Sequence, residues 1–300
     1  MQIGIRLHDT KECPFEERLR VIKSQGFECV QIDLSKTRGI PFETGMLTPG
    51  YAKWLGRQFQ KAELDIAVLG NYRNLSHPDP VKIIEIQYSY AASLRFAALC
   101  GACVVGTEAG IPDADERFSK EACRNKDALN IFIRNLQPVV KAAESCGVSL
   151  AIEPAYRKVV WNAKTAREML DRIGSPNLRI IFDPVNLIDP EMPEAAEETI
   201  AEAMDILEPE IEVVHLKDYM IEDGTLKPMG CGFGNMDYKA IIKFVEEKKP
   251  FIHTILENTD PMTAKQSRRK IIDMAYDAGG EDMRGVPGGL IKGIGEMPLI

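Results

Sequence analysis

The sequence predicts a single (β/α)₈ barrel, and two observations carry this prediction. First, eight short apolar runs recur along the 300 residues, with helical periodicity between them. Second, several runs, such as Ile211–Leu216, are mostly apolar rather than alternating, which is typical of parallel strands covered by helices. Eight strand–helix units close most naturally into a barrel.

The eight expected strands are Ile3–Leu7, Cys29–Asp33, Asp65–Leu69, Ala102–Gly106, Val148–Glu153, Leu178–Asp183, Ile211–Leu216 and Ile252–Glu257. The expected helices are Pro14–Gln25, Pro80–Leu99, Asp127–Cys146, Ala163–Ile173, Pro193–Leu207, Asp237–Lys248 and Met262–Ala278. Glycine follows three of these helices, at positions 26, 147 and 174, where it commonly ends a helix. A doubly wound open sheet is the competing architecture, but no GxGxxG follows the first strand.

No linker rich in Pro, Ser or Gly divides the chain, so we expect one domain. The barrel is expected to occupy residues 1–280. Residues 281–300 contain Gly and Pro without periodicity, and we expect them to form a C-terminal tail.

Composition excludes several classes of partner. The chain has 37 Lys and Arg against 45 Asp and Glu, a net charge of −8, which argues against a nucleic-acid-binding surface.

No apolar run approaches the roughly 18 residues of a membrane span, and the N-terminus lacks the pattern of a signal peptide. Seven scattered cysteines are expected to be reduced thiols. These features together predict a cytoplasmic protein.

Four consecutive strands end in residues that commonly bind metals: Glu153, Asp183, His215 and Glu257. Each follows an apolar run, where an unpaired charge is costly. Any one of them alone could cap a helix or pair with a Lys or Arg. Because the carboxyl ends of barrel strands meet at one mouth, the four together are best explained by a shared cation. Three carboxylates and one imidazole suit Mn²⁺, with Mg²⁺, Co²⁺ and Zn²⁺ as alternatives.

The chain resembles the xylose-isomerase-like barrel superfamily, which includes sugar isomerases and epimerases, hydroxypyruvate isomerase, inosose dehydratase and endonuclease IV. The resemblance spans roughly residues 1–280 and depends on the order and spacing of short motifs. These are Val68–Asn74, Ala151–Pro154, Ile181–Pro184, Val214–Asp218, the glycine-rich run Gly230–Tyr238, and Ile255–Asn258.

The resemblance implies one divalent metal bound by Glu153, Asp183, His215 and Glu257. It also implies that Glu153 and Glu257 act as acid and base on opposite faces of a substrate carbon. The implied activity is isomerisation or epimerisation of a sugar, keto-sugar or polyol derivative. A lyase similar to inosose dehydratase is the first alternative. A phosphodiesterase similar to endonuclease IV is less favoured, because its three-zinc site needs many histidines and this chain has four. A non-catalytic binding protein is also less favoured, because all four metal ligands are present.

Two positions depart from the family's ketose 3-epimerases. Where those enzymes often carry a histidine three residues after the metal-binding aspartate, this chain has Asn186. Where they tend to carry an arginine six residues after the metal-binding histidine, this chain has Ile221. Both changes weaken a ketose 3-epimerase assignment without affecting the metal site.

Five further residues follow the strands and are candidates for substrate contact: His8, Tyr72, Glu108, Asn186 and Lys217. Lys217 lies on the same side of its strand as His215, so it would contact either the substrate or a neighbouring carboxylate. The expected partner is a small carbohydrate. The sequence is compatible with a homo-oligomer, either a dimer or a tetramer.

Overall fold

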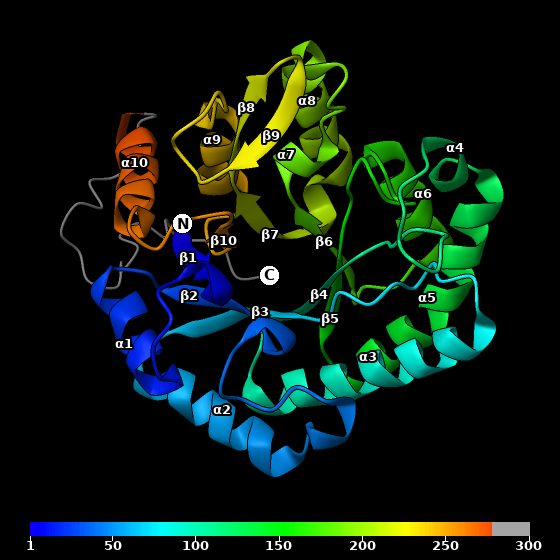
Figure 1. Cartoon of the computed structure of the whole chain (residues 1–300), viewed down its shortest axis with the longest axis horizontal. Coiled ribbons are helices and arrows are strands. Elements are labelled where there is room, and N and C mark those ends of the chain that lie inside the picture. Colours follow the sequence, from blue (N-terminus) through cyan, green and yellow to red (C-terminus); the bar gives the residue numbers. More distant parts are fainter. Residues whose placement is uncertain (278–300) are drawn as a thin grey trace, which may run out of the picture.

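The structure, a computed structural model that describes residues 1–277, contains a closed barrel of eight parallel strands surrounded by helices (Figure 1). The strand order around the barrel is β1-β10-β7-β6-β5-β4-β3-β2. The barrel strands are β1 (Gln2–Arg6), β2 (Cys29–Asp33), β3 (Asp65–Gly70), β4 (Val104–Glu108), β5 (Ser149–Glu153), β6 (Leu178–Phe182), β7 (Ile211–Leu216) and β10 (His253–Leu256). Every expected strand is present within two residues, and the (β/α)₈ fold is confirmed.

The helices pack on the outside of the barrel. They are α1 (Phe15–Ser24), α2 (Pro49–Lys61), α3 (Pro80–Cys100), α4 (Lys120–Cys123), α5 (Lys126–Cys146), α6 (Ala163–Ile173), α7 (Pro184–Leu187), α8 (Ala196–Leu207), α9 (Lys239–Lys248) and α10 (Ala264–Asp277). All seven expected helices are found, although Ala278 and the expected tail at 281–300 lie outside the described residues. The sequence analysis did not identify α2.

Two apolar clusters stabilise the fold. The larger one fills the shell between the strands and the outer helices. The smaller one lies inside the barrel and consists of Cys29, Ala67, Val68, Val104, Ala151, Ile181, Val213 and Ile255. This inner cluster forms an apolar floor below the carboxyl ends of the strands, where the active sites of such barrels lie.

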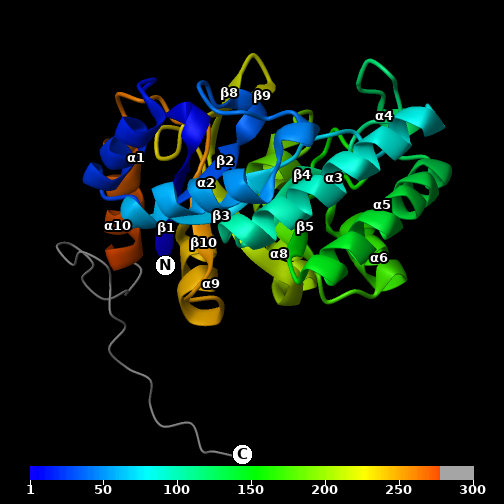
Figure 2. The ribbon, with the colours of Figure 1, turned by 90° about the horizontal axis from the view of Figure 1, so that it is seen from below.

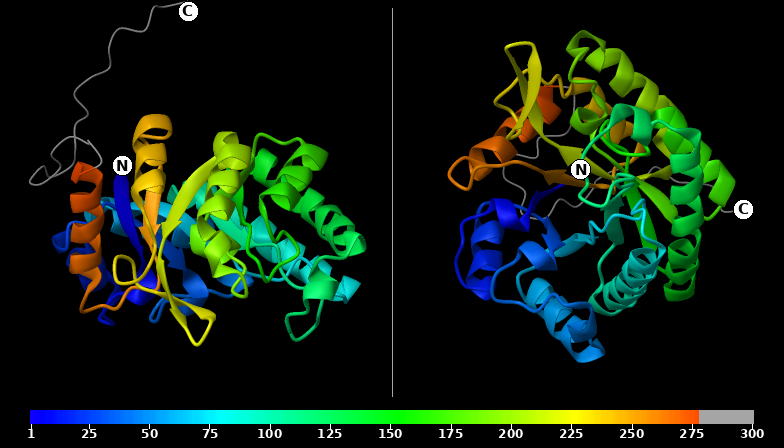
Figure 3. Two further views of the ribbon diagram at one scale, coloured as in Figure 1. Left: turned by 90° about the horizontal axis from the view of Figure 1, so that it is seen from above. Right: turned by 45° about the vertical axis from the view of Figure 1, so that its right-hand side comes forward.

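One antiparallel hairpin interrupts the alternation of strands and helices. It is formed by β8 (Asp218–Glu222) and β9 (Thr225–Met229), directly after β7. Figure 2 and the left view of Figure 3 show that this hairpin and α4 project from the same edge of the barrel. That edge is the one where the strands end. Among residues 1–277, no helix is both long and apolar enough to cross a membrane.

Candidate active site and metal centre

The chemistry-bearing side chains form a layer directly above the apolar floor. Residues two positions apart in a strand point to the same face, so this layer follows the floor residues by two. On the strands β5, β6, β7 and β10 it would contain Glu153, Asp183, His215 and Glu257. On β1 to β4 it would contain Arg6, Gln31, Gly70 and Gly106. The layer therefore has an acidic half and a half that is mostly neutral.

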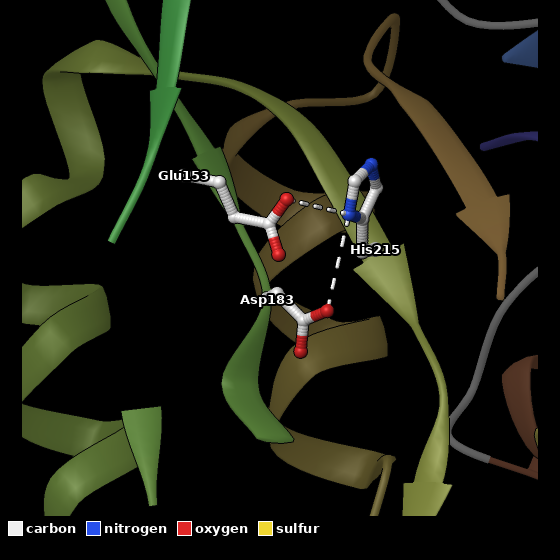
Figure 4. A group of neighbouring side chains, drawn as sticks. All are labelled: Glu153, Asp183 and His215. Atoms are coloured by element: carbon white, nitrogen blue, oxygen red, sulfur yellow. Dashed lines mark ion pairs between the residues drawn. The ribbon is translucent and has the colours of Figure 1, made fainter. Parts of the chain in front are cut away.

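Glu153, Asp183 and His215 come together with their side chains buried (Figure 4). One oxygen or nitrogen atom from each lies within 4.8 Å of the other two. His215 Nδ1 is 3.6 Å from Glu153 Oε2 and 3.8 Å from Asp183 Oδ2. Figure 4 shows both carboxylates reaching toward the imidazole from neighbouring strands.

Glu257, at the end of the next strand β10, contacts the same imidazole nitrogen as the other two carboxylates. Its Oε1 atom is 3.3 Å from His215 Nδ1 and also 3.3 Å from Arg6 Nη1. Its Oε2 atom is 3.4 Å from Lys217 Nζ. Burial alone would raise the pKa of Glu257, but His215, Lys217 and Arg6 outweigh it and lower the pKa to about 2. The Glu257 carboxylate is therefore held in its ionised form.

Lys217 forms salt bridges with two of the acidic residues, Asp183 and Glu257. Its ammonium lies 2.6 Å from Asp183 Oδ2 and donates a 2.8 Å hydrogen bond to Asn186 Oδ1. Asn186 in turn donates through its side-chain nitrogen to Glu153 Oε1. Lys217 thus forms salt bridges with its carboxylate neighbours, and Asn186 connects it to Glu153.

Asp183 is the most deeply buried of the carboxylates, with no exposed surface. Its Oδ1 atom accepts the backbone N–H of Asn186 at 3.0 Å and so caps the short helix α7. Burial raises the pKa of Asp183 to about 6, although Lys217 opposes this rise. The two carboxylates Asp183 and Glu257 therefore differ in how readily each takes up a proton.

The donor set fits a divalent cation. Neither ring nitrogen of the fully buried His215 has a hydrogen-bond partner within residues 1–277, and such groups are normally satisfied. Ligand atoms on an ion about 2.1 Å away would lie about 3.0–3.4 Å apart, close to the spacing around Nδ1.

The charges of the cluster lead to the same conclusion. With His215 neutral, as a metal ligand must be, the charges that remain come from carboxylates and two cations. The carboxylates are Glu153, Asp183, Glu257 and also Asp9, which pairs with Arg6 at 2.9 Å. The two cations are Lys217 and Arg6. A divalent cation would balance the two negative charges that remain.

The remaining sequence-predicted residues lie around this cluster. Glu108 is the lateral neighbour of Glu153 and pairs with Lys158, with 2.7 Å between Oε2 and Nζ. The Tyr72 hydroxyl accepts a 2.8 Å hydrogen bond from Gln31. His8, in the turn after β1, has a pKa lowered to about 4 by burial and by Arg6. At neutral pH His8 is therefore uncharged.

Sequence reasoning missed Arg6 and Gln31. Arg6 donates to both carboxylate oxygens of Asp9 and to Asn258 Oδ1, and so lies between the first and last strands of the barrel. Gln31 is its lateral partner on β2. The metal ligands were identified from their places at the ends of apolar runs. Arg6 and Gln31 could have been found from the two-residue period of a strand, because they stand above the small residues Gly4 and Cys29.

Comparison with known proteins agrees with this geometry. Residues 19–274 match the family described as xylose isomerase-like TIM barrel. The chain belongs to this family. None of the curated proteins matches the sequence.

The fold is similar to several solved structures. D-psicose 3-epimerase from Clostridium cellulolyticum H10 is 14% identical, with a TM-score of 0.70, covering 93% of this chain and 100% of that one. The IolI protein, solved with a zinc atom, is 15% identical, with a TM-score of 0.68 and coverages of 93% and 99%. A xylose isomerase-like protein from Mycobacterium smegmatis, solved with magnesium, is 14% identical, with a TM-score of 0.67 and coverages of 92% and 97%. At these identities the likeness concerns the fold.

Proposed function

We propose that this protein is a divalent-metal-dependent isomerase or epimerase that acts on a sugar, keto-sugar or polyol derivative. The observation that carries the proposal is the pair of buried glutamates, Glu153 and Glu257, which both contact His215 Nδ1. In the barrel order they are separated by β6 and β7, so a substrate between them would meet a carboxylate from each side. This arrangement supports proton removal at one face of a carbon and proton return at the same or the other face.

In this proposal Glu153, Asp183, His215 and Glu257 hold one divalent ion. Mn²⁺ is our first choice, because a set rich in carboxylates suits a hard ion, and the zinc and magnesium found in structural neighbours are the alternatives. When bound, the ion would supply Lewis-acid polarisation of a substrate carbonyl. The side chains around it would exclude water and keep Lys217 against Asp183.

The two glutamates are expected to differ in strength as bases. Glu257 is flanked by Lys217 and Arg6, and nearby cations make a carboxylate a weaker base. Within residues 1–277, Glu153 has no Lys or Arg side chain paired with it: it accepts a hydrogen bond from the neutral amide of Asn186 and lies 3.6 Å from the imidazole of His215. We therefore assign proton removal to Glu153 and the return of the proton to the region of Glu257. Asn186, Lys217, Tyr72, His8 and Glu108 would bind the substrate around them.

The test is a panel of aldo- and keto-sugars incubated in D₂O with protein loaded with Mn²⁺, and then with Mg²⁺, Co²⁺ and Zn²⁺. Proton NMR, after the metal is removed, follows deuterium entry at the carbon beside the carbonyl. Exchange accompanied by a new sugar isomer supports the proposal. Exchange followed by loss of water would instead support the lyase, and cleavage of a phosphodiester would support the hydrolase.

Replacement of each glutamate gives the sharper result. Glu153→Gln and Glu257→Gln keep the size and one oxygen of the side chain but remove the base. We expect each to lower turnover by about 10²–10⁴-fold, the usual contribution of general acid–base catalysis. Glu153→Gln should abolish deuterium exchange more completely than Glu257→Gln. Near-normal turnover in both variants with metal bound would contradict the assignment.

A further inference from the structure

The neutral half of the ligand layer has two strand positions without a side chain. Here β3 and β4 contribute Gly70 and Gly106 in place of side chains, and the aromatic ring of Tyr72 occupies part of the room. A Cβ atom at Gly70 would lie 2.7 Å from Tyr72 Cε2, and one at Gly106 would lie 3.9 Å from the Tyr72 hydroxyl oxygen. Gly70 therefore allows the Tyr72 side chain to fold over the mouth of the barrel, whereas the room at Gly106 is taken mainly by Val68 and Ile181.

Gln31 fixes the hydroxyl of Tyr72 in this position. Gln31 is only 1% exposed, and its Nε2 atom donates a 2.8 Å hydrogen bond to the Tyr72 oxygen. Because the phenol oxygen accepts this bond, its own proton is left to donate elsewhere. The Oε1 atom of Gln31 is buried and has no hydrogen-bond partner within residues 1–277. The pair thus offers one donor and one acceptor.

These two groups lie across the barrel from two of the candidate metal ligands, Asp183 and His215. In the closed strand order, β2 is diametrically opposite β6, and β3 is opposite β7. Gln31 therefore faces the side that carries Asp183, and the glycine below Tyr72 faces the side that carries His215. Burial, and then the charges of Glu153 and Glu257, raise the pKa of Tyr72 well above its usual value, which keeps its proton in place.

We infer that Gln31 and Tyr72 form a recognition pair for a neutral hydroxyl group of the substrate. Tyr72 donates to the hydroxyl oxygen, and Gln31 Oε1 accepts the hydroxyl proton, while the reacting carbons lie over the acidic half. The inference rests on the proposed function, and it specifies the substrate as a polyhydroxylated molecule without an anionic group at this end.

The charges around the pair favour a neutral group over a phosphate. Lys36 lies 5.4 Å from the Tyr72 ring centre but pairs with Asp33 at 3.5 Å. Arg6, beside Gln31 in the sheet, is matched by Asp9 and Glu257. Lys158 on the β5 side is matched by Glu108. Each of these cations already has a carboxylate partner, whereas a phosphate needs a cation that is available.

The test follows the side-chain amide of Gln31 directly. Protein labelled with ¹⁵N-glutamine and loaded with Mg²⁺ is titrated with D-psicose, D-tagatose, D-fructose and D-fructose 6-phosphate. The Gln31 signal is assigned from the Gln31→Met variant, and the exposed Gln60 serves as the internal control. We expect at least one neutral sugar to shift the Gln31 amide signal and leave that of Gln60 in place. The phosphate ester should bind no more tightly than fructose.

Tyr72→Phe keeps the ring over Gly70 and removes only the hydroxyl. We expect it to weaken the binding of the neutral sugar about 3- to 12-fold, the value of one hydrogen bond. Its Mg²⁺ affinity, measured by calorimetry, should be unchanged. The matched control is Tyr88→Phe, since Tyr88 is 71% exposed on α3, and it should bind sugar as the wild type does.

The outcomes separate this inference from the proposed function, because the amide titration in H₂O is paired with a deuterium-exchange measurement in D₂O on the same protein preparation and sugars. Exchange without any shift of the Gln31 signal would overturn the recognition pair and leave the function standing. A shift that Tyr72→Phe weakens, without exchange, would support the pair and contradict the isomerase. A shift that Tyr72→Phe leaves unchanged, tighter binding of the phosphate ester, or no shift with any sugar would overturn the pair.

Discussion

Lys217 lies among carboxylates that would otherwise repel one another. It is 4% exposed and contacts both Asp183 and Glu257. Breaking a buried ion pair by removing one partner is costly because the other charge stays buried and uncompensated. Lys217 is therefore expected to stabilise the site in the metal-free state, and the metal would share that task once it is bound.

Replacement of this lysine by methionine tests the idea. Lys217→Met is expected to lower the free energy of unfolding of the metal-free protein by about 3–5 kcal/mol. Saturating Mg²⁺ should recover part of the loss, so the metal-induced rise in Tm should be larger in the variant than in the wild type. Lys164→Met is the matched control, because Lys164 forms an exposed pair with Glu202 and its replacement should change the stability little. Equal losses in the two variants would contradict this view of the site.

Asp183 gives the metal site a dependence on pH. Its pKa is about 6 in the folded, metal-free protein, so below that pH the carboxyl group is protonated and must release a proton when the metal binds. Against the effect of burial, the neighbouring carboxylates also raise the pKa of His215, so this imidazole must lose a proton as well when the metal binds. The Mg²⁺ affinity should therefore weaken as the pH falls from 7 to 5, by about tenfold or more per pH unit below 6. Calorimetry in buffers of different ionisation enthalpy would count the released protons. An affinity that does not change across this range would mean that Asp183 is not a ligand.

At the scale of elements, the strands were predictable because each is a short apolar run that begins or ends at a polar residue. Helix α2 was missed because Gly50 and Gly56 weaken its helical pattern, although Thr48 caps its first turn. At position 56 the backbone of Cys100 leaves no room for a Cβ atom, so the glycine follows from tertiary packing. The hairpin β8–β9 was missed because its residues are mostly exposed and show no buried run.

The glycine-rich segment after this hairpin depends on one buried carboxylate. Asp218, 1% exposed, accepts backbone N–H groups from Tyr219, Gly232, Gly234 and Met236 at 2.8–3.0 Å. Asp218→Asn replaces one acceptor oxygen with a donor and leaves buried N–H groups unsatisfied. We expect a loss of about 2–4 kcal/mol, measured by urea unfolding. Asp237→Asn, at an exposed helix start, should change stability little. A small effect at Asp218 would show that the segment is held by other contacts.

At the scale of the whole molecule, the convergence of the four candidate ligands followed from the sequence, since a barrel brings all its strand ends to one mouth. The sequence could not predict which charged and polar residues around these ligands pair with one another. Lys217 was left open between substrate and carboxylate, and the structure pairs it with Asp183 and Glu257. Arg6 and Gln31 were missed because each occurs alone on its strand. Their roles depend on lateral neighbours, which only the barrel register defines.

A metal bound at this site would connect half of the barrel wall. The four candidate ligands follow β5, β6, β7 and β10, which are consecutive in the closed strand order. A ligand that binds only the folded state stabilises it, by about 2.7 kcal/mol at one hundred times its Kd. For a chain of 300 residues we therefore expect Mn²⁺ at that concentration to raise Tm by roughly 4 °C, with one ion per chain. Amide exchange should slow most in these four strands and least in β2 and β3.

Asp183→Asn is the matched control for this effect, because it keeps the size of the side chain and removes one charged ligand. The variant should lose most of the metal-induced rise in Tm and the added protection of β5, β6, β7 and β10. Elemental analysis after chelation and reloading gives the stoichiometry independently. Retention of three zinc ions per chain would favour phosphodiester hydrolysis over proton transfer. Slowed exchange spread evenly over all eight strands would mean that the ion acts on the fold from some other site.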